Sequence, residues 1–107
     1  MDYIRNDYET ILERKNAKEE GSYTCYLFEQ GIDKILKKVG EESTEMVIAA
    51  KNSVKEDTVG EICDLIYHTL VMMVDCDISI EDVEAELHRR AEKTGNLKKF
   101  HQVDKNS

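Results

Sequence analysis

Apolar residues recur at helical spacing along the first half of the chain. One stripe runs through Tyr3 to Lys15, at Ile4, Tyr8, Ile11 and Leu12. A short helix is predicted over Tyr23 to Gln30, because Ser22 is a typical N-cap residue and Gly31 a typical stop. The segment from Ile32 to Asn52 continues with a period of about 3.6 residues and predicts a long amphipathic helix.

The second half of the chain shows the same periodicity. A polar connector is predicted over Asn52 to Thr58, a second long helix over Val59 to Asp75, and a last helix over Ile80 to Glu92. Ser79 precedes that helix with Asp82 three residues on, the pattern of an N-cap followed by an early acid. From about residue 93 the periodicity is weak, which predicts a poorly structured tail.

These elements indicate one all-α domain over residues 1–107, an antiparallel helical bundle of about four to five helices. The connector between the two long helices is short, so they should lie antiparallel and adjacent. A chain of 107 residues with 40% apolar residues has enough material for one small core. We therefore expect the core to be completed by dimerisation, in a homodimer or a higher homo-oligomer.

Charge and composition narrow the class of protein. Fifteen Lys and Arg against 23 Asp and Glu leave a net charge of −8, which argues against binding nucleic acid or an anionic membrane surface. The longest apolar run, Ile62 to Val74, is shorter than the roughly 20 residues of a membrane span. The three cysteines form no Cys-x-x-Cys pair, and the first residues do not form a signal peptide, so we expect a cytoplasmic protein.

Acidic residues on the two long helices are the strongest candidates for chemistry. The helix predicted over Val59 to Asp75 is apolar around most of its circumference, and its polar stripe is narrow: Glu61, Asp64, His68 and Asp75. Antiparallel packing would bring Glu61 and Asp64 toward Glu42 and Glu45 of the preceding helix. Four converging carboxylates repel one another, and a divalent cation would relieve that repulsion. All-oxygen ligands favour Mg²⁺, or else Mn²⁺.

A structural interpretation of each residue stands beside the functional one. The acids near Glu45 could form a solvated face paired with lysines such as Lys51, in a helical dimerisation module without catalysis. His68 fits a hydrogen-bonded core residue better than a metal ligand. The cluster of Lys34, Lys37 and Lys38 is either solvated or positioned to hold phosphate.

Three segments of the chain resemble a known enzyme family. Ser22 to Glu42 (SYTCYLFEQGIDKILKKVGEE), Glu45 to Asn52 and Glu61 to His68 are similar to the phosphoribosyl-ATP pyrophosphohydrolases of histidine biosynthesis. These enzymes belong to the MazG-like all-α nucleotide pyrophosphatases, whose signature is Glu-x-x-Glu followed by Glu-x-x-Asp. The resemblance extends from about Tyr8 to Arg90 and implies a helical bundle completed by a second subunit.

The resemblance also implies an activity and a site. The activity is hydrolysis of phosphoribosyl-ATP between its α and β phosphates to phosphoribosyl-AMP and pyrophosphate, the second step of L-histidine biosynthesis. The implied metal ligands are Glu42, Glu45, Glu61 and Asp64, with Glu41 as an additional acid and His68 behind them. Candidate phosphate-binding residues are Lys34, Lys37, Lys38, Lys51, Ser22 and Thr24. The alternative is a housekeeping (deoxy)nucleoside triphosphate pyrophosphatase that uses the same metal site.

Overall fold

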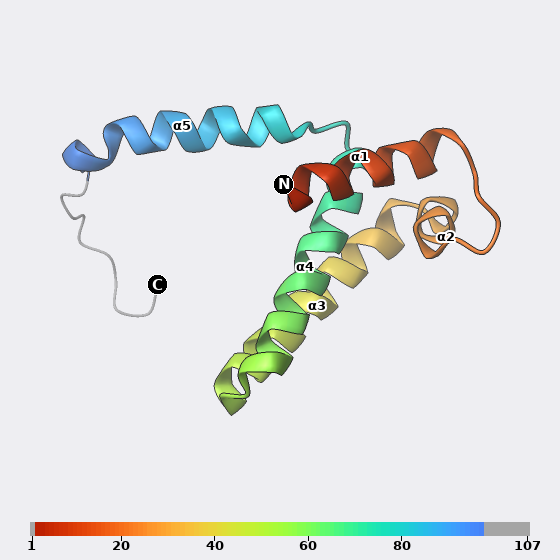
Figure 1. Ribbon diagram of the computed structural model, residues 1–107, viewed down its shortest axis with the longest axis horizontal. Coiled ribbons are helices and arrows are strands. Elements are labelled where there is room, and N and C mark those ends of the chain that lie inside the picture. Colours follow the sequence, from red (N-terminus) through yellow and green to blue (C-terminus); the bar gives the residue numbers. More distant parts are fainter. Residues whose placement is uncertain (1, 98–107) are drawn as a thin grey trace.

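The computed structural model describes the backbone of residues 2–97 and the side chains of residues 2–93 (Figure 1). The described chain forms five α-helices and no strand, which confirms the all-α class. The helices are α1 (Tyr3–Asn16), α2 (Tyr23–Gln30), α3 (Ile32–Asn52), α4 (Lys55–Asp75) and α5 (Ile80–Leu97).

Helices α3 and α4 form an antiparallel hairpin and share the most extensive contact between elements (Figure 1). Their connection is only Ser53, in a left-handed conformation with φ of 62°, and Val54. The predicted connector, Asn52 to Thr58, was too long, because α4 already begins at Lys55. Glu56 and Asp57 look polar enough for a loop, but acids in a first helical turn are stabilised by the helix dipole.

The core lies where α1 and α2 cover one end of this hairpin (Figure 1). Its buried side chains come from all five helices: Ile11, Leu27, Ile35, Leu70, Val71, Met73, Val74 and Ile80. Leu27, Ile35 and Val71 are fully buried, so α2, α3 and α4 are joined through their best-packed residues. This packing fixes one end of the hairpin, and the predicted site residues lie farther along it.

Three predicted helix boundaries are confirmed by their cap geometry. The Ser22 hydroxyl accepts a hydrogen bond from the Cys25 amide at 3.1 Å, and Gly31 ends α2 with φ of 94°. Before α5, the Ser79 amide donates to the Asp82 carboxylate at 2.9 Å while the Ser79 hydroxyl accepts from the Asp82 amide at 3.0 Å. These reciprocal bonds satisfy donors that a bare helix start would leave unpaired.

Helix α5 extends away from the rest of the molecule (Figure 1). It is tied to α1 through Arg5, whose guanidinium pairs with Glu81 and, at 2.9 Å, with Glu84. The helix continues to Leu97, beyond the predicted end at Glu92. The rest of the predicted tail lies outside the described residues.

Large apolar side chains remain exposed on the hairpin and on α5. On α3 and α4 these include Val47, Ile48 and Val59, which are 50–60% exposed, and on α5 Leu87, which is 58% exposed. The radius of gyration is 16.7 Å, against about 13 Å for a compact domain of this length. Ile62, at the start of the long apolar run of α4, is 40% exposed. Among residues 2–97, no helix has the length and apolar run needed to cross a bilayer.

Candidate active site

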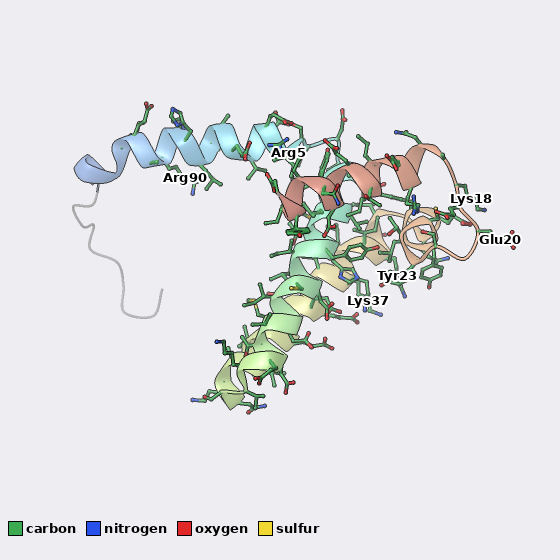
Figure 2. The ribbon with its side chains drawn as sticks, viewed as in Figure 1. Arg5, Lys18, Glu20, Tyr23, Lys37 and Arg90 are labelled. Atoms are coloured by element: carbon green, nitrogen blue, oxygen red, sulfur yellow. The ribbon has the colours of Figure 1, made fainter. Side chains whose placement is uncertain are left out.

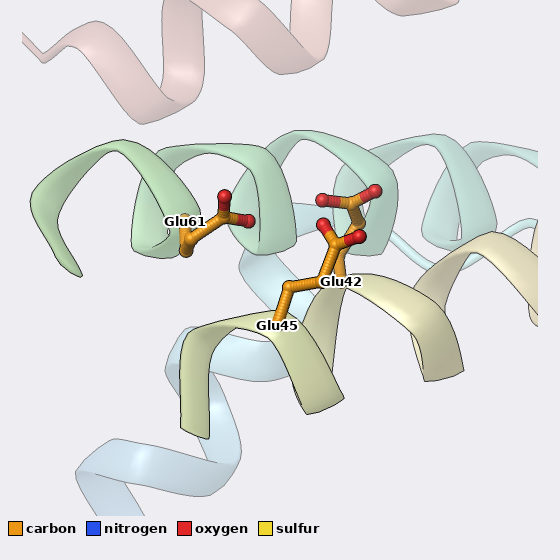
Figure 3. Close-up of side chains that lie close together, drawn as sticks. All are labelled: Glu42, Glu45 and Glu61. Atoms are coloured by element: carbon orange, nitrogen blue, oxygen red, sulfur yellow. The ribbon is translucent and has the colours of Figure 1, made fainter. Parts of the chain in front are cut away.

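Three of the predicted carboxylates meet in the middle of the α3–α4 hairpin. Glu42 and Glu45 lie one turn apart on α3, and Glu61 reaches toward them from α4 (Figure 3). One carboxylate oxygen from each residue lies within 4.8 Å of the other two. Antiparallel pairing is the cause, since it sets the Glu-x-x-Glu segment of one helix against the start of the Glu-x-x-Asp segment of the other.

The three acids lie in a partly dehydrated environment. Glu42 is buried, Glu61 is half-buried and Glu45 is exposed. The Oε2 atom of Glu61 is buried and has no hydrogen-bond partner among the described residues. The pKa of the Glu61 carboxyl is raised, because desolvation and then the charges of Glu45 and Asp64 disfavour its ionised form. A buried carboxylate oxygen without a donor is costly unless a cation contacts it.

The donor set fits a hard divalent cation. Mg²⁺ binds six oxygens at about 2.1 Å, so opposite ligands stand about 4.2 Å apart. Neighbouring ligands of such an ion stand about 3.0 Å apart, so the three oxygens, which lie within 4.8 Å of one another, would have to draw together around it. Carboxylates are the ligand type that Mg²⁺ and Mn²⁺ prefer, and the described part of the chain brings no cysteine or histidine into this group.

The other two predicted acids lie at the edges of the group. Asp64 follows Glu61 by one turn. Together with Glu45 and Glu61 it lines a groove of about 460 Å³, but its carboxylate lies outside the compact three-residue group. Glu41 is exposed, and its Oε1 atom lies 3.4 Å from Nζ of Lys38. The compact site in this structure therefore consists of Glu42, Glu45 and Glu61, with Asp64 beside it.

Lys38 is the one predicted phosphate-binding lysine that pairs with the acids of this site in the described chain. Its Nζ lies 3.4 Å from Oε1 of Glu41 and 3.4 Å from Oε2 of Glu42. Burial by itself would lower the pKa of the Lys38 ammonium, but Tyr23, Glu42 and Glu41 together raise it above its usual value. Lys38 therefore stays charged beside the carboxylates.

The remaining candidates for phosphate binding lie farther out. Lys37 lines a shallow hollow with Glu41 and Glu45, whereas Lys34 is half-buried and Lys51 is exposed. Ser22 and Thr24 line a different hollow, beside Arg14. The Ser22 hydroxyl caps α2 and the Thr24 hydroxyl bonds the hydroxyl of Tyr67, so both have structural roles. Their part in phosphate binding stays a prediction.

His68 is buried one turn after Asp64 and is held on both ring nitrogens. Its Nδ1 lies 2.8 Å from the Asp64 carbonyl oxygen, and its Nε2 lies 3.1 Å from the Tyr23 hydroxyl (Figure 2 labels Tyr23). Because a carbonyl can only accept, Nδ1 carries the proton and donates it, and Nε2 accepts from Tyr23. His68 is thus a hydrogen-bonded buried residue beside Asp64, and its ring also packs edge-on against Tyr67.

The sequence analysis did not identify Tyr23 and Tyr67 as residues of the site. Tyr23 and Tyr67 stack with ring centroids 6.2 Å apart and connect α2 to α4 beside the site. Their sequence positions could have pointed to them, because Tyr23 directly follows the predicted cap Ser22 and Tyr67 directly precedes His68 of the polar stripe. The polar stripe of α4 also included Asp75, which proves to be an ion-pair partner of Lys15 on α1 at 2.8 Å.

Comparison with known proteins identifies the family. The phosphoribosyl-ATP pyrophosphohydrolase family model matches residues 5–91. The phosphoribosyl-ATP pyrophosphatase of Clostridium novyi (strain NT) is 54% identical over 98 residues, which are 92% of this chain and 89% of the relative. The one of Clostridium acetobutylicum is 60% identical over 91 residues, 85% of this chain and 83% of the relative.

A two-function protein is also among the relatives. The histidine biosynthesis bifunctional protein HisIE of Caldanaerobacter subterraneus subsp. tengcongensis is 58% identical over 93 residues, which are 87% of this chain and 45% of that protein. The matches to the single-function relatives extend over most of both chains, and the range of the family match spans the positions of the four carboxylates. The chain belongs to the phosphoribosyl-ATP pyrophosphohydrolase family.

Proposed function

We propose that the chain hydrolyses phosphoribosyl-ATP to phosphoribosyl-AMP and pyrophosphate at a metal site formed by Glu42, Glu45, Glu61 and Asp64. The convergence of three of these carboxylates around a buried, unpartnered oxygen of Glu61 carries the assignment. Family membership supplies the substrate and places the reaction in histidine biosynthesis. The cation is Mg²⁺ or, with similar ligand preference, Mn²⁺.

The carboxylates of the site would supply the chemical groups that the hydrolysis needs. A bound divalent cation would neutralise charge on the phosphate oxygens and on the leaving pyrophosphate. The oxygen of the attacking water forms a bond to phosphorus while the bridging bond between the α and β phosphates breaks. A carboxylate of the set that does not bind the cation accepts the proton of the water. Desolvation first, and then the charges of Glu45 and Asp64, raise the pKa of the Glu61 carboxyl, which makes its carboxylate a stronger base than an exposed one.

The positive charges for the triphosphate lie on the same side of α3. Lys38 already pairs with Glu41 and Glu42, and Lys37 lines the adjoining hollow. An ammonium group binds phosphate as a compact point charge without a fixed approach direction. We place Lys37 and Lys38 against the phosphates and leave Lys34 and Lys51 as outer charges that attract the substrate.

We further propose that the functional unit is a homodimer or a larger homo-oligomer. The exposed apolar residues Val47, Ile48, Val59 and Ile62 lie on the two helices that hold the carboxylates. Covering them with a second copy would bury apolar area and exclude water from the groove beside them.

The test is product analysis by anion-exchange chromatography. Phosphoribosyl-ATP and a panel of deoxynucleoside triphosphates are incubated with the protein, with and without Mg²⁺. We expect Mg²⁺-dependent release of pyrophosphate and phosphoribosyl-AMP, with little turnover of the panel. The variants Glu45→Gln and Asp64→Asn should lose most of this activity while they stay folded, because each removes one repelling charge.

The matched control is Glu9→Gln, which removes an exposed carboxylate on α1. It should keep the activity of the parent. Turnover of deoxynucleoside triphosphates alone would keep the site but assign the protein to housekeeping hydrolysis. Full activity in both site variants would mean that these acids form only a solvated surface, and it would favour a helical dimerisation module.

A further inference from the structure

Lys38 places a positive charge beside two of the acids at the proposed site, Glu41 and Glu42. Its side chain is 25% exposed, and that of Glu42 is 9% exposed, so the pair is shielded more than an ordinary surface pair. Nζ lies at the same distance, 3.4 Å, from one oxygen of Glu41 and one oxygen of Glu42. One ammonium therefore serves two carboxylates at the edge of the three-acid group.

The geometry of these pairs is loose. A strong charge-assisted hydrogen bond between ammonium and carboxylate is about 2.7–2.9 Å long, clearly shorter than the distances at Lys38. Lys38 also precedes its acids in the helix, which is the weaker order for pairs three and four residues apart. A contact of this kind compensates charge but can be given up at small cost.

A cation bound by Glu42 would compete directly with this ammonium. An ion about 2.1 Å from Oε2 of Glu42 would stand no more than about 5.5 Å from Nζ. Two positive charges at that separation repel each other. Lys38 would then turn from the carboxylates toward an anion bound beside the three acids, and the triphosphate is the anion that the proposed function brings there.

We infer that Lys38 is the internal counter-ion of the metal-free site, and that it transfers from Glu41 and Glu42 to a substrate phosphate when the divalent cation binds. This inference rests on the proposed function twice, for the metal site at Glu42 and for the anion that the site binds. It assigns Lys38 two opposite effects. The ammonium weakens binding of the cation in the absence of substrate and strengthens binding of the substrate once the cation is present.

The test measures the two effects separately. Isothermal titration calorimetry with MgCl₂, without substrate, compares the parent with Lys38→Met. This variant keeps a side chain of similar length and removes the charge. We expect Lys38→Met to bind Mg²⁺ roughly threefold to tenfold more tightly. At saturating Mg²⁺ its KM for phosphoribosyl-ATP should rise by about tenfold, because one charged contact to phosphate is lost.

Two further variants serve as controls. Lys38→Arg keeps the charge and should bind Mg²⁺ as the parent does. Lys18→Met removes a charge far from the hairpin, in the α1–α2 connection, where Lys18 pairs with Glu29 at 3.2 Å (Figure 2 labels Lys18). It should leave both measurements unchanged, and circular dichroism checks that each variant is folded. Lys38→Gln is the neutral replacement if the methionine variant fails this check.

The outcomes separate the inference from the proposed function. If the parent binds Mg²⁺ and the neutral variants bind it equally or more weakly, Lys38 is not a competing counter-ion, and the metal site stands without it. Tighter Mg²⁺ binding with an unchanged KM would refute the transfer to the substrate. If the parent does not bind Mg²⁺ at all, the proposed metal site fails and the inference fails with it.

Discussion

Replacing Tyr23 by Phe isolates one buried hydrogen bond behind the proposed active site. The change deletes only the hydroxyl that lies 3.1 Å from Nε2 of His68. His68 is 6% exposed, and its other nitrogen is already engaged with the Asp64 carbonyl. Nε2 is therefore left as a buried acceptor without a donor, which costs about 1–3 kcal/mol of unfolding free energy. For a domain of this size each kcal/mol lowers Tm by roughly 4–8 °C.

Urea denaturation followed by circular dichroism measures this loss. The matched control is Tyr26→Phe, since Tyr26 stacks on Tyr23 but its hydroxyl makes no hydrogen bond among the described residues. We expect the control to stay within about 0.5 kcal/mol of the parent. Long-range ¹⁵N–¹H spectra of the parent should show the proton of His68 on Nδ1. Equal small losses in both variants, or a proton on Nε2, would refute the arrangement that joins Tyr23, His68 and Asp64.

Three further predictions address packing, titration and assembly. Ile35→Ala should lose about 2–5 kcal/mol of unfolding free energy in urea, because Ile35 is fully buried, whereas Leu36→Ala, at a site 45% exposed, should lose much less. A loss as large at Leu36 would contradict the assigned core. Because the folded state raises the Glu61 pKa above 4.5, folded protein binds more protons there than unfolded protein does. Stability in metal-free buffer should thus fall as pH rises from 4.5 through that raised pKa, and thermal unfolding of Glu61→Gln should show a weaker fall. Analytical ultracentrifugation should give a mass above the 12.4 kDa of one chain, and sedimentation as a monomer at working concentration would count against the oligomer.

The helices could be predicted from the sequence because their causes are local. Apolar spacing, the Ser22 cap, the stop at Gly31 and the Ser79–Asp82 pair all act within one or two turns. The start of α4 was predicted four residues too late, because local polarity alone was used to place it. Polar residues from Lys55 onward resemble a loop by polarity alone, although they also suit the first turn of a helix.

The grouping of Glu42, Glu45 and Glu61 was also within reach of the sequence. Two long helices with a short connector have to pair antiparallel, and that pairing determines which turns face each other. The position of Asp64 was less predictable, because a carboxylate one turn farther along joins the group only if the rotation of α4 about its axis directs it inward. The exposure of Ile62 has the same origin, since no residue within 2–93 covers that side of α4.

The sequence by itself thus determined the helices, the hairpin and the acids that meet in it, because these follow from short-range periodicity and one topological constraint. Only the tertiary structure decided that Tyr23 forms a hydrogen bond with His68 and that Asp75 forms an ion pair with Lys15. A long polar side chain can reach several hydrogen-bond or ion-pair partners on neighbouring helices. The choice among them depends on helix crossing and burial, which have no period in the sequence.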